Sequence, residues 1–134
     1  MIYFDSSALV KLVRREAESQ ALREWLTSHT DPVVSSAVSR TEVSRAVLKD
    51  FVNLGERAKR VLSAVEMIPM TFDLLDDAGT LAVELRSLDA IHLASALLVR
   101  GDLDAFVAYD KRLLTAADQM GLPVAAPGTA EAAA

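Results

Sequence analysis

The sequence predicts an α/β domain in which a mostly parallel central sheet of four to five strands is covered by helices on both faces. The first observation is that short, apolar, β-prone runs alternate along the chain with longer segments of helical periodicity. The second is the length of 134 residues, which suits one domain. The third is a composition of 51% hydrophobic and 25% charged residues, which indicates a packed fold.

The N-terminal part of the chain predicts one strand and two helices. Residues 1–4 are apolar and β-prone, and Asp5 follows them with a side chain that suits the start of a helix. Residues 8–15 and 18–28 both carry apolar side chains at helical spacing. Pro32 lies where this pattern breaks.

The middle of the chain repeats the order of strand and helix. Residues 33–38 predict a second strand, and a helix is expected to begin at residue 39 and to stop at Gly55. Another helical stretch follows this glycine as far as residue 66. Residues 67–71 then predict a short strand and residues 73–86 a helix.

The C-terminal part predicts two more helices and two more strands. Residues 88–100 form an apolar helical pattern, and Gly101 after them suits a C-terminal cap. Residues 106–109 predict a strand, residues 111–120 a helix, and residues 122–125 a last edge strand. Strands that alternate with helices in this way favour a parallel sheet.

One domain over residues 1–126 and a flexible C-terminal tail over residues 127–134 are therefore expected. The absence of cysteine excludes disulfides, zinc ribbons and thiolate nucleophiles. No apolar run approaches the roughly 20 residues that cross a bilayer, and the start lacks a basic signal-peptide region, so we expect no membrane association and a cytoplasmic protein. The net charge of −5 does not exclude a nucleic-acid substrate, because a cluster of metal-binding acids would itself lower the charge.

Four acidic residues fall where a parallel α/β sheet gathers its ligands, at the carboxyl ends of the strands. Asp5 directly follows the first predicted strand, and Asp110 follows the strand predicted over residues 106–109. Glu42 lies in the first turn after the second strand, and Asp89 opens the long apolar helix. These four positions are the candidate site.

Each of these acids also has an ordinary structural explanation. Asp5 and Asp110 can each cap the helix that follows. Glu42 comes three residues after Ser39, which is a capping-box pattern. Asp89 suits the positive end of a helix dipole. Taken one at a time, these explanations are as good as a functional role.

Taken together they are weaker, because apolar residues flank both Asp5 and Asp89. A carboxylate in such a setting is costly unless something compensates it. A divalent cation is such a compensator, and carboxylates without cysteine select a hard ion such as Mg²⁺. The pattern therefore points to metal-assisted phosphodiester hydrolysis, in which ions activate water and stabilise the leaving oxygen.

Four short segments, spread over nearly the whole chain, carry a family resemblance. From Asp5 there are 37 residues to Glu42, then 47 to Asp89 and 21 to Asp110. In order and context the segments resemble a PIN domain of the VapC toxin group. They are MIYFDSSAL at residues 1–9, SRTE at 39–42, LDAIHLA at 88–94 and FVAYDKRL at 106–113.

The resemblance implies a three-layer α/β/α fold, usually homodimeric, with endoribonuclease activity that depends on Mg²⁺, for which Mn²⁺ can substitute. It implies a structured RNA substrate such as transfer or ribosomal RNA, and a cognate VapB-type antitoxin that covers the acidic cleft. Carried over by position, Asp5, Glu42, Asp89 and Asp110 would be the catalytic and metal-binding quartet, with Asp5 and Asp89 as direct ligands. Ser7 is expected to support Asp5 or a water on the metal.

The chain departs from the family pattern at Ala108, where many members carry Thr or Ser two residues before the last acid. For this reason we interpret Asp110 as an indirect ligand or a ligand of a second ion. His92, one helical turn after Asp89, is interpreted as a core histidine satisfied by a hydrogen bond in preference to a proton shuttle.

Three arginines lie close in sequence to the acids. Arg112 follows Asp110 by two residues, and Arg40 and Arg45 flank Glu42. All three suit contact with RNA phosphates, and all three equally suit ion pairs on a solvated surface. Of the three, Arg112 is the candidate for a supporting role at the site.

Other classes of protein fit less well. A phosphatase of the haloacid dehalogenase type also starts with an Asp after its first strand, but it requires a second Asp where this chain has Ser7. A receiver domain requires paired acids at the first strand end. A catalytically inactive PIN-like module that binds RNA or protein stays open as the alternative, although such a module would usually have lost one of the acids.

Overall fold

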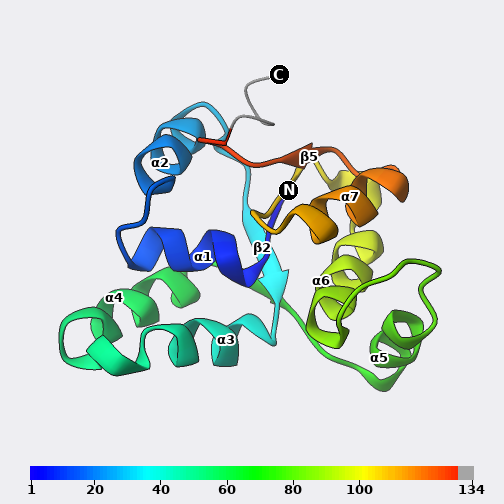
Figure 1. The fold of residues 1–134 in the computed structure, drawn as a ribbon, viewed down its shortest axis with the longest axis horizontal. Coiled ribbons are helices and arrows are strands. Elements are labelled where there is room, and N and C mark those ends of the chain that lie inside the picture. Colours follow the sequence, from blue (N-terminus) through cyan, green and yellow to red (C-terminus); the bar gives the residue numbers. More distant parts are fainter. Residues whose placement is uncertain (130–134) are drawn as a thin grey trace.

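The computed structural model describes residues 1–129, and in this part of the chain all strands join one parallel sheet (Figure 1). The strand order across the sheet is β3-β2-β1-β4-β5, so the first strand is central. This confirms the predicted α/β class and the parallel sheet. The strands are β1 (Ile2–Phe4), β2 (Val33–Ser36), β3 (Glu66–Ile68), β4 (Ala105–Val107) and β5 (Val124–Ala125).

Helices cover both faces of the sheet and complete the three layers. In Figure 1 the first group lies on the left of the sheet and the second on the right. The first group is α1 (Ser6–Val13), α2 (Ser19–Thr27), α3 (Ser39–Ala46) and α4 (Phe51–Ser63). The second group is α5 (Phe72–Gly79), α6 (Ser87–Leu98) and α7 (Lys111–Gln119).

The central strand β1 shows why the two layers form. Successive side chains of a strand point to opposite faces, and all three residues of β1 are fully buried. Ile2 and Phe4 pack in the cluster formed with α1 to α4. Tyr3 packs in the cluster formed with α6 and α7, where its ring stacks on Phe106 with 5.3 Å between centroids. A strand buried on both faces must be apolar throughout, which is what its sequence predicts.

The predicted helix stop at Gly55 is wrong. The break lies earlier, where α3 ends at Ala46 and a short 3₁₀ turn over Leu48–Asp50 leads into α4. Gly55 lies within α4 and is buried, and a β-carbon there would lie 2.9 Å from the ring of Phe51. A side chain here would meet the ring of Phe51 one turn earlier, and the glycine does not end the helix.

The helix predicted over residues 73–86 is too long. Helix α5 ends at Gly79, and residues 80–86 continue as an irregular connection to α6. Leu81, Val83 and Leu85 are partly buried against the α6–α7 side of the core, while the residues between them are exposed. This alternation has the period of an extended chain, and it was visible in the sequence.

Gly101 and Gly121, which follow helices, differ in backbone conformation. Helix α6 ends at Leu98 and tightens into a 3₁₀ turn, in which the amide of Asp102 donates to the carbonyl of Val99 at 2.9 Å. Gly101 lies inside this turn without a positive φ, so the predicted left-handed cap is wrong. Gly121, after α7, does take a left-handed conformation with φ +84°.

The first residues of the predicted tail contact the domain. The hydroxyl of Tyr109 donates to the carbonyl of Pro127 at 2.8 Å, and Gly128 has φ +93° close to Ala21 of α2. The rest of that tail, residues 130–134, lies outside the described residues. None of the helices within residues 1–129 is long and apolar enough to span a bilayer.

Candidate active site

The sheet brings all four predicted acids to one cavity. Strands β2 and β4 flank β1, so the chain leaves all three strands at the same edge of the sheet. Asp5 follows β1, Asp110 follows β4, Glu42 lies in α3 after β2, and Asp89 lies in the first turn of α6. All four line a cavity of about 380 Å³. Residues separated by more than 100 positions therefore face one volume, as the switch point of a parallel sheet predicts.

Asp5 caps helix α1 and also lines the cavity. Its Oδ1 accepts hydrogen bonds from the backbone amide of Ala8 at 3.0 Å and from the hydroxyl of Ser7 at 2.6 Å. Only 4% of the residue is exposed. Its Oδ2 has no hydrogen-bond partner among residues 1–129. The cap fixes one oxygen of the carboxylate and leaves the other available to a ligand.

Ser7 links the ends of the two central strands. Its hydroxyl oxygen donates to Asp5 and accepts the backbone amide of Tyr109, just beyond β4, at 3.3 Å. The predicted contact between Ser7 and Asp5 is therefore present. Ala108, where many relatives carry a hydroxyl, is fully buried in the apolar cluster of α6 and α7. No hydroxyl from this position reaches the site.

Glu42 is held by side chains from two other elements. Its Oε1 accepts hydrogen bonds from Ser6 in α1 and from Nε2 of His92 in α6, the latter at 2.8 Å. The capping-box explanation is wrong, because α3 has no side-chain cap and Ser39 instead contacts Ser35 at 2.7 Å. Burial raises the pKa of Glu42, but the hydrogen bonds from His92 and Ser6 outweigh it, so the pKa lies below the ordinary 4.5.

His92 is buried and satisfied, as expected, and it also acts on the site. The amide of Ser36 donates to the hydroxyl oxygen of Tyr3 at 3.1 Å, so the Tyr3 proton is directed to Nδ1 of His92 at 2.7 Å. When the ring carries a single proton, Nδ1 is then the acceptor and that proton lies on Nε2, which donates to Glu42. The tautomer assigned from this network fixes the direction in which Glu42 is held.

Replacement of Tyr3 by Phe tests this network. The change removes the acceptor for the amide of Ser36 and the donor to His92, and it leaves two buried polar groups without partners. We expect Tyr3→Phe to lower the free energy of unfolding by about 1–3 kcal/mol. Urea unfolding followed by circular dichroism measures this, and a loss below the error of the method would contradict the assigned hydrogen bonds.

Asp110 repeats the arrangement of Asp5. Its Oδ1 accepts the amide of Leu113 at 3.0 Å and so caps α7, while Oδ2 has no hydrogen-bond partner among the described residues. The carboxylate of Asp89 has no hydrogen bond or ion pair within residues 1–129, although the residue is partly buried. Each of the four carboxylates therefore presents at least one oxygen that the described chain does not satisfy.

The site raises the pKa of two of its carboxyls. Burial raises the pKa of Asp5 above the ordinary 3.8, repulsion from Asp89 adds to this, and attraction to His92 and the bond from Ser7 offset it in part. Burial and repulsion from Asp110 raise the pKa of Asp89, against attraction to His92 and Arg86. The site thus holds negative charges in a place that disfavours them.

These carboxylates fit a hard divalent cation. The donors are carboxylate oxygens, the ligands that Mg²⁺ and Mn²⁺ prefer, and their repulsion is of the kind that a cation relieves. Within residues 1–129, no three acidic or histidine side chains are grouped closely enough to surround an ion by themselves. An ion here would be bound by one or two carboxylates and complete its shell with water, which is how proteins commonly hold Mg²⁺.

The raised pKa values predict how the metal-free protein responds to pH. Folded Asp5 and Asp89 keep their protons above pH 3.8, where the unfolded chain releases them, so stability falls as the pH rises through this window. A divalent cation that binds only the folded state should reverse the loss. We expect Mg²⁺ to raise Tm at neutral pH and to have little effect at acid pH. An equal gain in Tm for an Asp5→Asn variant would contradict binding at this cavity.

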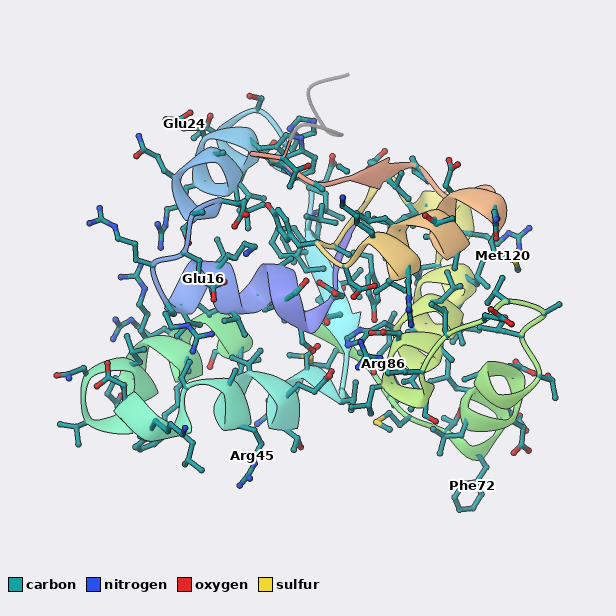
Figure 2. All side chains as sticks on the ribbon, in the orientation of Figure 1. Glu16, Glu24, Arg45, Phe72, Arg86 and Met120 are labelled. Carbon is teal, nitrogen blue, oxygen red and sulfur yellow. The ribbon has the colours of Figure 1, made fainter. Side chains whose placement is uncertain are left out.

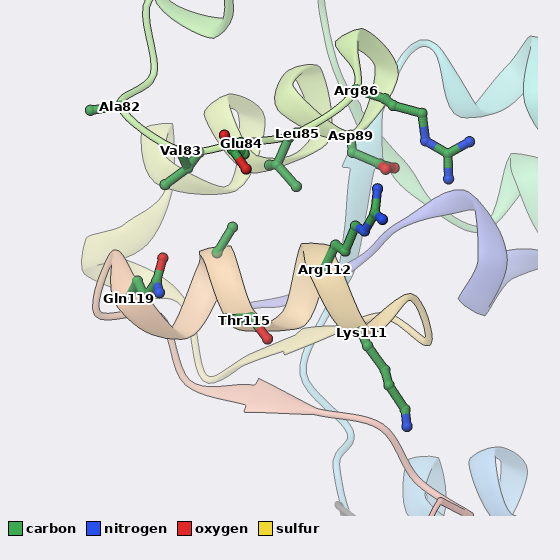
Figure 3. A pocket seen from close by; sticks show the side chains of 11 residues that line it. Ala82, Val83, Glu84, Leu85, Arg86, Asp89, Lys111, Arg112, Thr115 and Gln119 are labelled. Carbon is green, nitrogen blue, oxygen red and sulfur yellow. The ribbon is translucent and has the colours of Figure 1, made fainter.

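The three arginines singled out from the sequence have different positions. Arg40 and Arg45 are exposed on α3 and do not line the acid cavity, and Arg45 projects away from the protein in Figure 2. Arg112 lines a second cavity beside Asp89 (Figure 3). Arg86 lines both cavities and lies near the centre of the molecule in Figure 2. Sequence reasoning missed Arg86, because it was placed inside the helix expected over residues 73–86.

Sequence reasoning also missed the contribution of Ser6. It was treated only as part of a helix start, yet its hydroxyl contacts Glu42, Ser39 and His92. Its position next to Asp5, at the start of the helix that follows the central strand, could have indicated this role. A side chain there points along the sheet edge where the acids meet.

The fold and the cavity define an α/β domain that gathers carboxylates where its central parallel strands end. The chain belongs to the PIN domain family, whose pattern it matches over residues 2–119. It is 46% identical over 128 residues to ribonuclease VapC46 of Mycobacterium tuberculosis, and the match covers 94% of this chain and 97% of that protein. It is 40% identical over 134 residues to ribonuclease VapC47 of the same species, with 96% and 98% covered.

A solved structure shows the same fold at lower identity. VapC20 of Mycobacterium tuberculosis, described as a sarcin–ricin loop cleaving toxin, superposes with a TM-score of 0.66 at 18% identity. The superposition covers 91% of this chain and 96% of that one. The three-layer PIN fold expected from the sequence is therefore confirmed.

Proposed function

We propose that this protein is a VapC-type toxin, an endoribonuclease that hydrolyses RNA phosphodiester bonds with the help of a divalent metal ion. The observation that carries the proposal is the set of four carboxylates that line one cavity, each with an oxygen that no described residue satisfies. The full-length relatives at 40–46% identity, which are named ribonucleases, support the choice of RNA as substrate.

Asp5 and Asp89 are the residues proposed to hold the ion directly. Asp5 is fixed by two hydrogen bonds to one oxygen, so its second oxygen is oriented before a ligand arrives. Asp89 lies at the start of α6 without a competing partner. A bound Mg²⁺, for which Mn²⁺ can substitute, supplies Lewis acidity and lowers the pKa of water.

Glu42 and Asp110 are proposed to act around the ion, through water or a second ion. Each is bound through one oxygen, Glu42 by Ser6 and His92 and Asp110 by the amide of Leu113. Their second oxygens can accept protons from waters and so orient a nucleophile beside the scissile phosphate. Ser7 keeps Asp5 in place.

A cognate antitoxin of the VapB type is the proposed partner. A solved toxin–antitoxin complex from Klebsiella pneumoniae superposes with a TM-score of 0.68 at 22% identity, covering 84% of this chain and 89% of that one. The likeness to that complex supports the proposal that this chain binds such a partner. A homodimer is also proposed, and exposed Leu48, Phe51 and Val52 between α3 and α4 supply an apolar surface for an interface. Analytical ultracentrifugation tests this assembly.

Cleavage of total cellular RNA by purified, antitoxin-free protein with Mg²⁺ or Mn²⁺ tests the function. Discrete fragments support the proposal, and sequencing of their ends decides whether transfer or ribosomal RNA is the substrate. A folded, metal-loaded protein that binds RNA and leaves it intact would instead indicate the inactive binding module.

A further inference from the structure

A second cavity adjoins the acid cavity and differs from it in charge. It has a volume of about 910 Å³ and lies between the connection at residues 82–86 and helix α7 (Figure 3). Arg86 and Asp89 line both cavities, so the two meet at these residues. In Figure 3, Asp89, Arg86 and Arg112 lie at one end and Gln119 lies at the other. The second cavity thus leads away from the acids.

The alternation of residues 81–86 builds one wall of this cavity. Val83 and Leu85 pack against the core and hold the connection in place, which leaves Glu84 and Arg86 exposed beside the cavity. Because the anchoring side chains recur at every second residue, the wall is held along its length.

Helix α7 builds the opposite wall. Arg112, Thr115 and Gln119 are spaced by three and four positions, so they share one face of the helix. All three are exposed and line the cavity. The buried face of the same helix carries Leu113 and Ala117, which fix it on the sheet. The cavity therefore has two anchored walls and a row of polar side chains.

Two arginines line this cavity at the end beside Asp89. They are Arg86 and Arg112, set against the acids Glu84 and Asp89, and the ammonium group of Lys111 points away from the cavity in Figure 3. The guanidinium groups of Arg86 and Arg112 have no hydrogen bond or ion pair in the part of the chain that the structure describes, although Asp89 attracts Arg86. If an ion neutralises Asp89, the two arginines outweigh the one remaining acid, Glu84, and the cavity favours an anionic ligand.

Some arginines of the chain are bound within the domain. Arg14, at the end of α1, bonds Glu16 at 3.0 Å and the carbonyl of Ala46 at 2.9 Å. Arg57 donates to the carbonyl of Leu12 at 3.0 Å. The two guanidinium groups beside Asp89 lack such bonds, although a guanidinium presents five donors in a fixed fork that matches phosphate.

We propose that the cavity between residues 82–86 and α7 binds the unpaired RNA strand that adjoins the scissile phosphate. Arg86 and Arg112 contact successive backbone phosphates next to the acid site, and Thr115 and Gln119 contact the sugar or base edges further along. This assignment rests on the proposed ribonuclease function and adds the path of the substrate to it.

The residues that line the cavity also indicate its preference for single strands and for particular bases. A cavity between two walls suits a single strand, and we expect a duplex, whose bases are already paired, to bind there less tightly. No aromatic ring is among the residues that line it, so the bases have no aromatic side chain to stack on here. Binding at this position depends on phosphate contacts, and we expect little preference for particular bases there.

Kinetics of an Arg112→Gln variant test the proposal. With a single-stranded oligoribonucleotide that spans the mapped cleavage site, we expect KM to rise about tenfold with a much smaller change in kcat. The salt dependence of binding should weaken by about 0.7 in log–log slope, the value for one lost phosphate contact on a single strand. Arg100→Gln is the matched control, because it makes the same change of charge in the 3₁₀ turn at the other end of α6.

Equal effects of the two substitutions on KM and on the salt slope would overturn the proposed path while leaving the ribonuclease function intact. Failure of the parent protein to cleave any RNA would instead count against the function. The two failures are therefore distinguishable in one experiment.

A labelling experiment tests the path without any cleavage. Since the chain has no cysteine, a Gln119→Cys variant carries one thiol at the far end of the cavity, and a Ser63→Cys variant carries one at the end of α4. In EDTA, total cellular RNA should slow maleimide labelling of the first variant at least about fivefold and leave the second unchanged. RNA binding without protection at position 119, or protection there by co-purified antitoxin alone, would overturn the inference.

Discussion

An Asp89→Asn variant is expected to lose RNA cleavage while it keeps its fold. Asp89 lines the acid cavity, and its carboxylate has no hydrogen bond or ion pair among residues 1–129, so no described hydrogen bond is lost with its charge. Asparagine has nearly the same shape but removes an anionic ligand. Because stabilisation by a metal ion contributes several kcal/mol to the transition state, we expect a loss of roughly a thousandfold in rate.

The matched control is Asp76→Asn, an identical change on the exposed surface of α5. This variant should cleave RNA at the rate of the parent. Single-turnover cleavage of a labelled substrate measures both, and circular dichroism checks the fold. An Asp89→Asn protein that cleaves within twofold of the parent would remove Asp89 from the mechanism.

Removal of divalent metal is expected to abolish cleavage reversibly. Among the described residues, no cationic side chain forms a hydrogen bond with Asp5 or Asp89. Burial and repulsion raise the pKa of both carboxyls. EDTA should stop the reaction to below about one hundredth of its rate, and Mg²⁺ or Mn²⁺ should restore it. The measurement is the cleavage rate after chelation and after addition of each ion in excess.

Activity that persists after thorough chelation would contradict a metal-dependent mechanism. Restoration by Zn²⁺ alone would contradict the preference for a hard ion that the carboxylate donors imply. Circular dichroism of the chelated protein serves as the control, because loss of the fold would also end the reaction.

The sequence predicted the placement of the four acids better than it predicted some helix ends. Asp5 and Asp110 follow strands that lie next to each other in the sheet, and the rule that parallel strands end at one edge is independent of exact boundaries. The cap and the functional role of Asp5 are compatible, because the cap uses one carboxylate oxygen and leaves the other. Local sequence alone therefore cannot separate the two roles.

The errors in helix boundaries have specific physical causes. Gly55 was treated as a helix stop, but it lies inside α4, where a β-carbon would meet the ring of Phe51 one turn earlier in the same helix. The connection at residues 80–86 was treated as helix, because its alternation of apolar residues was not weighed against the helical period. This error hid Arg86 and with it one wall of the second cavity.

The link from His92 to Glu42 could not be derived from the sequence. It depends on Tyr3 and Ser36, which lie in two different strands and orient the imidazole through Nδ1, the nitrogen that does not contact Glu42. The interpretation of His92 as a satisfied core histidine was confirmed. Its second nitrogen reaches Glu42 across the edge of the sheet, because α6 packs against β2, the strand that precedes α3.

A metal ion bound by Asp5 and Asp89 is central to the proposed mechanism, and a crystal soaked in Mn²⁺ tests its binding most directly. We predict an anomalous peak within about 2.0–2.3 Å of carboxylate oxygens of both residues, and its loss in the Asp89→Asn variant. A peak elsewhere, or an empty acid cavity in a protein that cleaves RNA under the same conditions, would contradict the central claim.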